Sequence, residues 1–329
     1  MLHRSQTGVA ALDRWSGPVY RALATFGTRE ETYLAMIEPT FCSGLADLAS
    51  RYRGFIVDQW GVLHDGARPY ADALECLVRL RDGDKRIVLL SNSGKRATVN
   101  RARLAELGID EALYDALVTS GEATWRALDE RIEPFFAKLG RRCLLWSRYG
   151  DRSTVAGLPL QVVERVEEAD FLLLAGVEDD ARLEDFNAQL EVAAGRGLPM
   201  VCANPDIVAV LPDGGFGMAP GAVAHHYEQL GGRVGYIGKP HRPIYQACLE
   251  ALGNLPQEEV LTIGDSIAHD VAGGAAMELD TALIMSGIHS RIFDLERGAA
   301  ANRAALEELA REYGVLPRWV LPRFRWAAY

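Results

Sequence analysis

Cysteine is scarce in this chain, and its arrangement excludes two structural classes. The five cysteines are scattered, and no two of them form a C-x-x-C pair. An odd, dispersed set of this kind predicts neither a disulfide framework nor a zinc site. Because free cysteines of this kind suit a reducing compartment, we expect a cytoplasmic protein.

Long apolar runs are also missing. The longest stretches, such as residues 171–177, are far too short to cross a bilayer. The first residues include Arg4 but show no apolar segment followed by a small-residue cleavage site, as a secretory signal would require. We therefore expect no membrane partner.

The chain lacks an excess of positive charge. Its formal net charge is −10, whereas proteins that bind phosphate backbones present basic surfaces, so we expect no nucleic-acid partner. Small phosphate esters remain accessible to an acidic protein that places a few cations and a metal locally. With 329 residues, 49% of them hydrophobic and 24% charged, the chain can form one large domain or two ordinary ones.

The most informative segment is the run that ends at Asp58. The apolar residues 55–57 predict a buried strand, and open α/β sheets bind ligands beyond the carboxyl ends of their strands, where Asp58 stands. Gly61 permits a tight turn directly afterwards. A carboxylate presented in this way can be a nucleophile, a metal ligand or both, or it can simply end a strand.

Apolar runs alternate with amphipathic segments along most of the chain. Predicted strands fall at residues 55–57, 86–90, 117–119, 143–146, 171–174, 199–203, 260–263 and 281–285, and predicted helices at 71–81, 97–107, 183–195 and 243–252. This alternation is typical of an α/β protein with a doubly wound, mostly parallel sheet.

Four segments at predicted strand ends carry groups suited to phosphoryl chemistry. Asp58 and Asp265 would repel each other unless a divalent cation lay between them, and Mg²⁺ prefers such oxygen ligands. Ser91 and Asn92 offer a hydroxyl and an amide to phosphate oxygens, and Lys239 offers a positive charge. Singly, each residue can be a cap, a turn or a surface group. Together, they predict a site that positions and neutralises a phosphoryl group.

In this order, the segments resemble the haloacid dehalogenase-like (HAD) hydrolase superfamily, and specifically subfamily IIA, which includes nitrophenylphosphatase-like and sugar-phosphatase-like proteins. Asp58 matches the nucleophile motif, Ser91 the second motif, Lys239 the third and residues 264–270 the fourth. The ordered set is far more specific than any one motif.

Two further stretches, residues 119–124 and 204–206, also look like this subfamily, and the resemblance extends over residues 40–295. It implies a Rossmann-like core and a Mg²⁺-dependent phosphatase that acts on a small phosphorylated metabolite through an aspartyl-phosphate. It also admits a homodimer formed through a cap domain.

The resemblance implies a role for each matching residue. Asp58, the backbone carbonyl of Trp60 and Asp265 would hold Mg²⁺. Asp270 would support the metal from behind its direct ligands or through water, or it would simply favour the start of a helix. Asp58 would attack phosphorus. Ser91 and Asn92 would hold phosphate oxygens, and Lys239 would offset charge.

The spacing of the motifs predicts where a second domain is inserted. Only about thirty residues separate Asp58 from Ser91, but 148 separate Ser91 from Lys239, far more than one crossover needs. We expect the following units: an N-terminal extension (1–39), a core domain (40–122 plus 236–295), an inserted α/β cap (123–235) and a C-terminal extension (296–329).

Both ends of the chain differ from its centre. Residues 1–35 lack a persistent amphipathic pattern, so we expect the N-terminal extension to pack poorly, and Met36 is a candidate translation start. The tail at 316–326 combines aromatic residues with arginines. We expect it to dock onto the core rather than to bind nucleic acid.

Position 60 departs from the family pattern. Most phosphatases of this superfamily carry a second aspartate two residues after the nucleophile, where it serves as general acid and then general base. Here that residue is Trp60, whose indole can only donate a hydrogen bond. Loss of such a group typically costs a factor of about 10² to 10⁴ in rate.

Three hypotheses follow from Trp60. His64, Asp65 or His269 can replace the missing acid, or the substrate can have a leaving group that needs no protonation. Alternatively, the protein is a catalytically weak, phosphate-ligand-binding or regulatory protein on the same scaffold. Asn204 and Asp206 either face the substrate from the cap or form a simple turn.

Overall fold

The computed structural model describes residues 38–210, 216–294 and 298–327. Met36 and nearly all of the predicted N-terminal extension lie outside these residues, so their predicted packing stays a prediction. Within the described residues, no helix combines the length and the apolar character that crossing a membrane requires.

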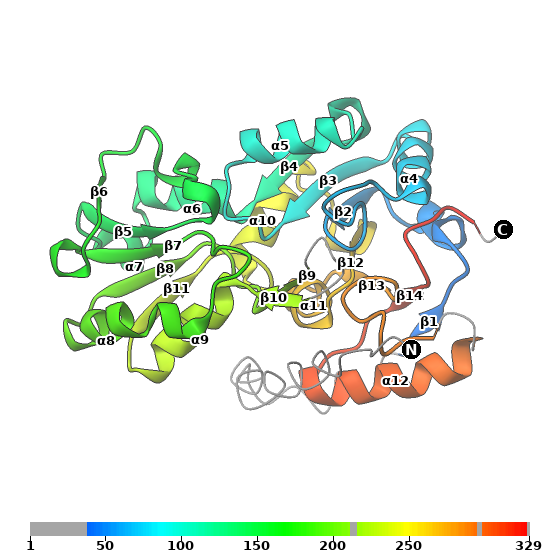
Figure 1. Cartoon of the computed structure of the whole chain (residues 1–329). Helices are drawn as coiled ribbons and strands as arrows, with labels where there is room; N and C mark the ends of the chain where they lie inside the picture. The colour runs from blue at the N-terminus through cyan, green and yellow to red at the C-terminus, as the bar shows by residue number, and fades with distance from the viewer. Residues whose placement is uncertain (1–37, 211–215, 295–297, 328–329) are drawn as a thin grey trace, which may run out of the picture.

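The larger of two parallel sheets has seven strands, in the order β1-β14-β13-β12-β2-β3-β4 (Figure 1). Its strands are β1 (Thr40–Phe41), β2 (Gly54–Asp58), β3 (Arg86–Ser91), β4 (Ala116–Thr119), β12 (Val260–Gly264), β13 (Asp280–Ile284) and β14 (Trp319–Leu321). The helices that connect or cover them are α4 (Ala71–Asp82), α5 (Ala97–Glu106), α10 (Arg242–Ala251), α11 (Ala272–Ala276) and α12 (Gly298–Tyr313).

The second sheet has five parallel strands, in the order β11-β8-β7-β5-β6. Its strands are β5 (Arg142–Trp146), β6 (Gln161–Val163), β7 (Phe171–Leu174), β8 (Pro199–Cys202) and β11 (Arg233–Tyr236). The accompanying helices are α6 (Ser120–Glu130), α7 (Pro134–Ala137), α8 (Asn187–Gly195) and α9 (Pro220–Gln229). A small antiparallel hairpin, β9 (Val208–Val210) with β10 (Phe216–Met218), follows β8.

The chain leaves the seven-stranded sheet after β4, builds the whole five-stranded sheet, and returns at β12. The predicted α/β fold with an inserted second α/β unit is therefore confirmed. We call this second unit the cap. The exact domain boundaries stay a prediction; β11, at the end of the predicted cap, pairs as an edge strand of the cap sheet.

Each sheet is buried on both faces, as parallel sheets require. In β2, Phe55 and Val57 pack with α4 and α5, whereas Ile56 packs with α10 on the opposite face. This period of two explains why the strand consists of an uninterrupted apolar run. The cap repeats the arrangement, with α8 and α9 on one face and α6 and α7 on the other.

The C-terminal tail supplies an internal strand that the sequence did not predict. β14 lies between β13 and β1, and α12 packs over it through a separate apolar cluster. A buried chain of hydrogen bonds secures it: Trp319 Nε1 donates to the Tyr52 hydroxyl (2.7 Å), which donates to Asp280 Oδ2 (2.5 Å). The tail is thus part of the sheet.

We predict that Tyr52→Phe lowers the free energy of unfolding by about 1–3 kcal/mol, because it leaves the buried Trp319 indole without an acceptor. Denaturant unfolding measures the change. Tyr70→Phe is the control, since the Tyr70 side chain is exposed. Equal stability of the two variants would contradict a structural role for the Tyr52 hydroxyl.

Candidate functional site

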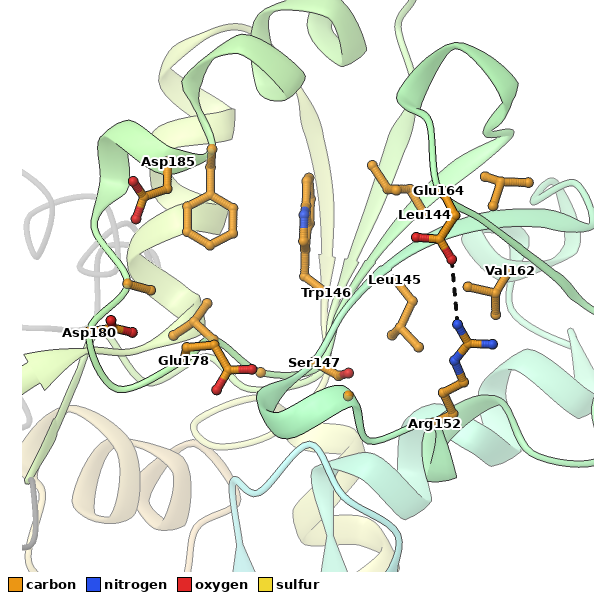
Figure 2. Close-up of a pocket in the computed structure, with 16 residues that line it drawn as sticks. Leu144, Leu145, Trp146, Ser147, Arg152, Val162, Glu164, Glu178, Asp180 and Asp185 are labelled. Carbon is orange, nitrogen blue, oxygen red and sulfur yellow. Dashed lines mark ion pairs between the residues drawn. The ribbon is translucent and has the colours of Figure 1, made fainter.

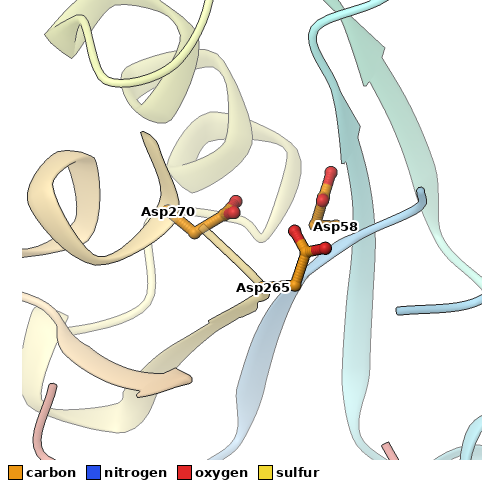
Figure 3. A group of neighbouring side chains, drawn as sticks. All are labelled: Asp58, Asp265 and Asp270. Atoms are coloured by element: carbon orange, nitrogen blue, oxygen red, sulfur yellow. The ribbon is translucent and has the colours of Figure 1, made fainter. Parts of the chain in front are cut away.

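Three carboxylates converge at the carboxyl ends of neighbouring strands (Figure 3). Asp58 ends β2, Asp265 directly follows β12, and Asp270 lies in a short π-helix, η9 (Ile267–Val271). Each offers an oxygen that lies within 4.8 Å of the others, and all three side chains are buried. Because β2 and β12 are adjacent and parallel, the sheet brings together residues that lie far apart in the sequence.

Lys239 connects this group. Its Nζ lies 2.7 Å from Asp58 Oδ1 and 2.8 Å from Asp270 Oδ1, and its side chain is buried. Burial alone would lower the pKa of Lys239, but the charges of Asp270 and Asp58 outweigh it and raise the pKa well above its usual value. The sequence suggested that Lys239 follows a strand of the core sheet. It lies instead on the segment between β11, a strand of the cap sheet, and α10.

The charges in this group do not balance. Burial raises the pKa of Asp58, and burial together with the Asp58 charge raises the pKa of Asp265 well above its usual value. If all three carboxylates were ionised beside the one lysine, the buried site would hold two excess negative charges. A divalent cation with oxygen ligands would neutralise that excess, so the residues present fit Mg²⁺.

The backbone closely surrounds Asp265. Its Oδ2 accepts a hydrogen bond from the Ile288 N–H (2.7 Å), and a Cβ at Gly61 or Gly287 would collide with its carboxylate. Gly61 also has a φ of +79°, so the tight turn expected from the sequence is present. Gly287 was not singled out from the sequence, although it follows shortly after a predicted strand. A cavity of about 220 Å³ adjoins Asp265 and is bordered by Trp60 and Tyr70.

Ser91 and Asn92 lie beside Asp58, at the end of the adjacent strand β3. Asn92 is buried and binds the lysine segment: its Oδ1 accepts from the Lys239 N–H (2.7 Å) and from Ser120 Oγ (3.3 Å). Ser91 Oγ accepts from the Ser93 N–H (3.2 Å). Asn92 therefore positions Lys239, a role that the sequence did not indicate. Its predicted contact with phosphate stays a prediction, as does that of Ser91.

The cap reaches the site through Asp206. Asp206 Oδ1 accepts a hydrogen bond from Asn92 Nδ2 (2.7 Å) and lies 3.7 Å from His269 Nδ1. Asn204 Oδ1 accepts a hydrogen bond from the Asp206 N–H (3.0 Å). This bond forms the turn that was one of the two alternatives predicted for residues 204–206. His269 also contacts Ser266 Oγ through Nδ1 (3.0 Å), and its burial lowers its pKa.

Trp60 and its neighbours form a separate cluster. The Trp60 ring packs over Gly66, where a Cβ would collide with it, and meets the His64 ring edge to face at 5.5 Å. His64 Nδ1 accepts from the Gly66 N–H (3.1 Å), and burial lowers the His64 pKa to about 4. Asp65 Oδ1 accepts from two backbone N–H groups in the following turn. Of the three proposed substitutes for the missing acid, His64 and Asp65 thus each have one side-chain atom bound within this loop, and their predicted role stays a prediction.

A larger cavity, of about 510 Å³, lies in the cap beside Trp146 (Figure 2). Phe186 lines it together with carboxylates such as Glu178 and Asp180, and an Arg152–Glu164 ion pair (3.6 Å) borders it. None of the site residues predicted from the sequence lines this cavity. The aspartate group, and not the larger cavity, is therefore the candidate active site.

The fold and this site together define a class of protein. A parallel α/β sheet that presents three aspartates and a lysine beneath an inserted α/β cap is typical of HAD-like hydrolases. Family comparison agrees: residues 55–161 match the model described as "Haloacid dehalogenase-like hydrolase", and residues 236–315 match the model described as "HAD-hyrolase-like". The chain belongs to the haloacid dehalogenase-like hydrolase superfamily, subfamily IIA.

Three relatives illustrate the similarity. A haloacid dehalogenase-like hydrolase from Brucella suis 1330 superposes with a TM-score of 0.73 at 31% identity, over 86% of this chain and 99% of that one. Sugar-phosphatase AraL of Bacillus subtilis (strain 168) is 27% identical over 71% of this chain and 83% of its own length. The p-nitrophenyl phosphatase from Archaeoglobus fulgidus superposes with a TM-score of 0.62 at 25% identity, over 83% and 97% of the two chains.

We predict that Mg²⁺ raises the melting temperature of the protein and that Asp265→Asn removes this response. Cation binding at about one hundred times its Kd stabilises a protein by about 2.7 kcal/mol.

Thermal melting with and without Mg²⁺ provides the measurement. Asp129→Asn, which changes an exposed carboxylate on α6, should respond to Mg²⁺ as the wild type does. An Asp265→Asn variant with an undiminished response would exclude Asp265 from the cation site.

Proposed function

We propose that this protein is a Mg²⁺-dependent hydrolase of small phosphate monoesters that works through an aspartyl-phosphate on Asp58. The observation that carries the proposal is Lys239, whose buried Nζ lies within 2.8 Å of both Asp58 and Asp270. Such a charge beside a strand-terminal carboxylate suits a group that must stay ionised and attack an anionic phosphorus centre.

In this mechanism, an Asp58 oxygen forms a bond to phosphorus as the ester P–O bond breaks and the alcohol leaves. Water then attacks phosphorus, the bond to Asp58 breaks, and inorganic phosphate leaves. Lys239 holds Asp58 in place and offsets the charge on the phosphoryl oxygens. Ser91, on the adjacent strand end, would orient those oxygens, whereas the Asn92 side chain, whose Nδ2 donates to Asp206 Oδ1 (2.7 Å) and to the Lys239 carbonyl (3.4 Å), would hold Lys239 in place.

Asp58, Asp265 and the Trp60 carbonyl would hold the cation, with Asp270 beside them. When bound, Mg²⁺ would supply electrostatic stabilisation of the phosphoryl oxygens. The support for a cation is the close approach of three buried carboxylates, whose ionised forms burial disfavours and whose donor atoms are all oxygens.

Relatives support the substrate class. Their names describe a sugar phosphatase, a D-glycerol 3-phosphate phosphatase and a ribonucleotide monophosphatase. We infer that this protein also takes a small phosphorylated metabolite, with the cap selecting the leaving group.

One observation favours a second candidate function, a catalytically weak protein that binds a phosphorylated ligand. Trp60 occupies the position of the usual general acid, and its ring packs against Gly66 and His64. A screen of phosphate esters with and without Mg²⁺ separates the two candidates. Saturable binding without turnover would favour the second.

We predict that Asp58→Asn abolishes phosphatase activity, by at least about a thousandfold in kcat, because an amide is isosteric but a poor nucleophile. Asp82→Asn, at an exposed position at the end of α4, should retain activity. Melting curves confirm that both variants fold. Equal turnover by Asp58→Asn and the wild type would remove Asp58 from the mechanism.

We predict that Trp60→Phe changes kcat and KM by no more than about threefold, because the role assigned to Trp60 uses its backbone carbonyl and the phenyl ring can still pack over Gly66. Steady-state kinetics with 4-nitrophenyl phosphate measures this. A loss of a hundredfold or more would instead give the indole a direct part in catalysis.

A further inference from the structure

The proposed hydrolysis needs an acid for the leaving group and a base for water, and Trp60 can be neither. The inference that follows rests on that proposed function. Of the nearby groups, His64 and Asp65 each have one side-chain atom bound within their own loop. Another segment of the chain also offers an acid.

Asp206 of the cap has the required placement. Its Oδ1 is bound by Asn92 Nδ2 at 2.7 Å, whereas its Oδ2 makes no hydrogen bond to any of the described residues. The side chain is 32% exposed, so a substrate or a water molecule can reach it. One oxygen is fixed and the other is available, which is the arrangement that a proton-transfer group needs.

A short series of contacts connects Asp206 to the nucleophile. The Asn92 side chain that holds Asp206 also accepts a hydrogen bond from the Lys239 N–H (2.7 Å), and Lys239 Nζ lies 2.7 Å from Asp58. The charge of Asp206 also contributes to raising the pKa of Asp58, so the two carboxylates are close enough to interact. Asp206 therefore faces the same site as Asp58, from the cap side.

We propose that Asp206 is the general acid and base of this enzyme, in place of the carboxylate that Trp60 replaces. In the first step, Asp58 bonds to phosphorus, the ester P–O bond breaks, and the Asp206 proton passes to the leaving oxygen. In the second, the Asp206 carboxylate takes a proton from water as that water attacks phosphorus. The P–O bond to Asp58 then breaks, which frees phosphate and leaves Asp206 protonated again.

Asn92 and His269 are positioning residues in this scheme. Asn92 fixes Oδ1 of Asp206, and His269 lies 3.7 Å from the same oxygen, so both act on the oxygen that does not transfer the proton. Because Asp206 belongs to the cap and Asp58 to the core sheet, the catalytic set is complete only when the cap contacts the core.

The test compares Asp206→Asn with the wild type on two esters, 4-nitrophenyl phosphate and glycerol phosphate. Glycerol phosphate has a poor leaving group, so its kcat should fall by about 10² to 10⁴. 4-Nitrophenolate needs no acid to leave, but the second step still needs the base. The variant should therefore release a burst of about one nitrophenolate per active site, followed by slow turnover.

Three further variants sharpen the test. Asp180→Asn alters an exposed cap carboxylate beside the other cavity and should match the wild type. Adding Trp60→Asp to Asp206→Asn should recover part of the lost rate, because it restores a carboxylate near the leaving group. Added formate should partly restore turnover to Asp206→Ala.

The outcomes separate this inference from the proposed function. An equal slowing of both esters without a burst would show that Asp206 has only a structural role, and unchanged kinetics in Asp206→Asn would show that it has none; either result overturns the inference alone. If the wild type hydrolyses no phosphate ester, the proposed function fails and the inference fails with it.

Discussion

The site depends on one buried ammonium group. Lys239 Nζ contacts Asp58 and Asp270 at once, and these two carboxylates belong to different elements of the core. Without this charge, three carboxylates would share a buried space at a cost of several kcal/mol for each unpaired ion. Even with it, full ionisation of all three would leave two excess negative charges, and burial accordingly raises the pKa of Asp265 well above its usual value. These buried carboxylates therefore destabilise the protein until a cation and a phosphoryl group bind together. This makes the site suited to catalysis rather than to stability.

The cost of holding these charges explains the surrounding architecture. Parallel strands buried on both faces form a rigid sheet. The carboxylates lie at the carboxyl ends of these strands, where they interrupt no hydrogen bond between strands. Gly61 and Gly287 let the backbone approach Asp265 so closely that its carboxylate has little freedom. Rigid surroundings of this kind prevent the charged side chains from moving apart, as they would in a more flexible site.

The core strands and the aspartates at their ends could be predicted from the sequence, because the sequence patterns that mark them are local. The apolar run before Asp58 and the Gly-Asp pair at residues 264–265 each mark a strand end without knowledge of the rest of the chain. What could not be predicted depends on pairing between distant segments. β14 joins a sheet whose neighbouring strands begin at residues 40 and 280, and no local pattern in the aromatic tail specifies that partner. The contact between Asn92 and Asp206 spans 114 residues and two sheets, so only the folded structure reveals that the cap loop reaches the nucleophile.

The junction between cap and core determines how well Asp206 can be positioned. Thr154 of the cap donates to the Gly94 carbonyl at 2.5 Å, and a Cβ at Gly94 would collide with the Ala175 backbone. The close approach of the Gly94 and Ala175 backbones tolerates little displacement, because no flexible side chain can absorb it. Asn92 lies two residues before Gly94, so the same contacts that seat the cap also hold the amide that binds Asp206. A carboxylate supplied by the cap can thus be placed as reproducibly as one supplied by the nucleophile loop, and this explains how the chain can accommodate a tryptophan at position 60.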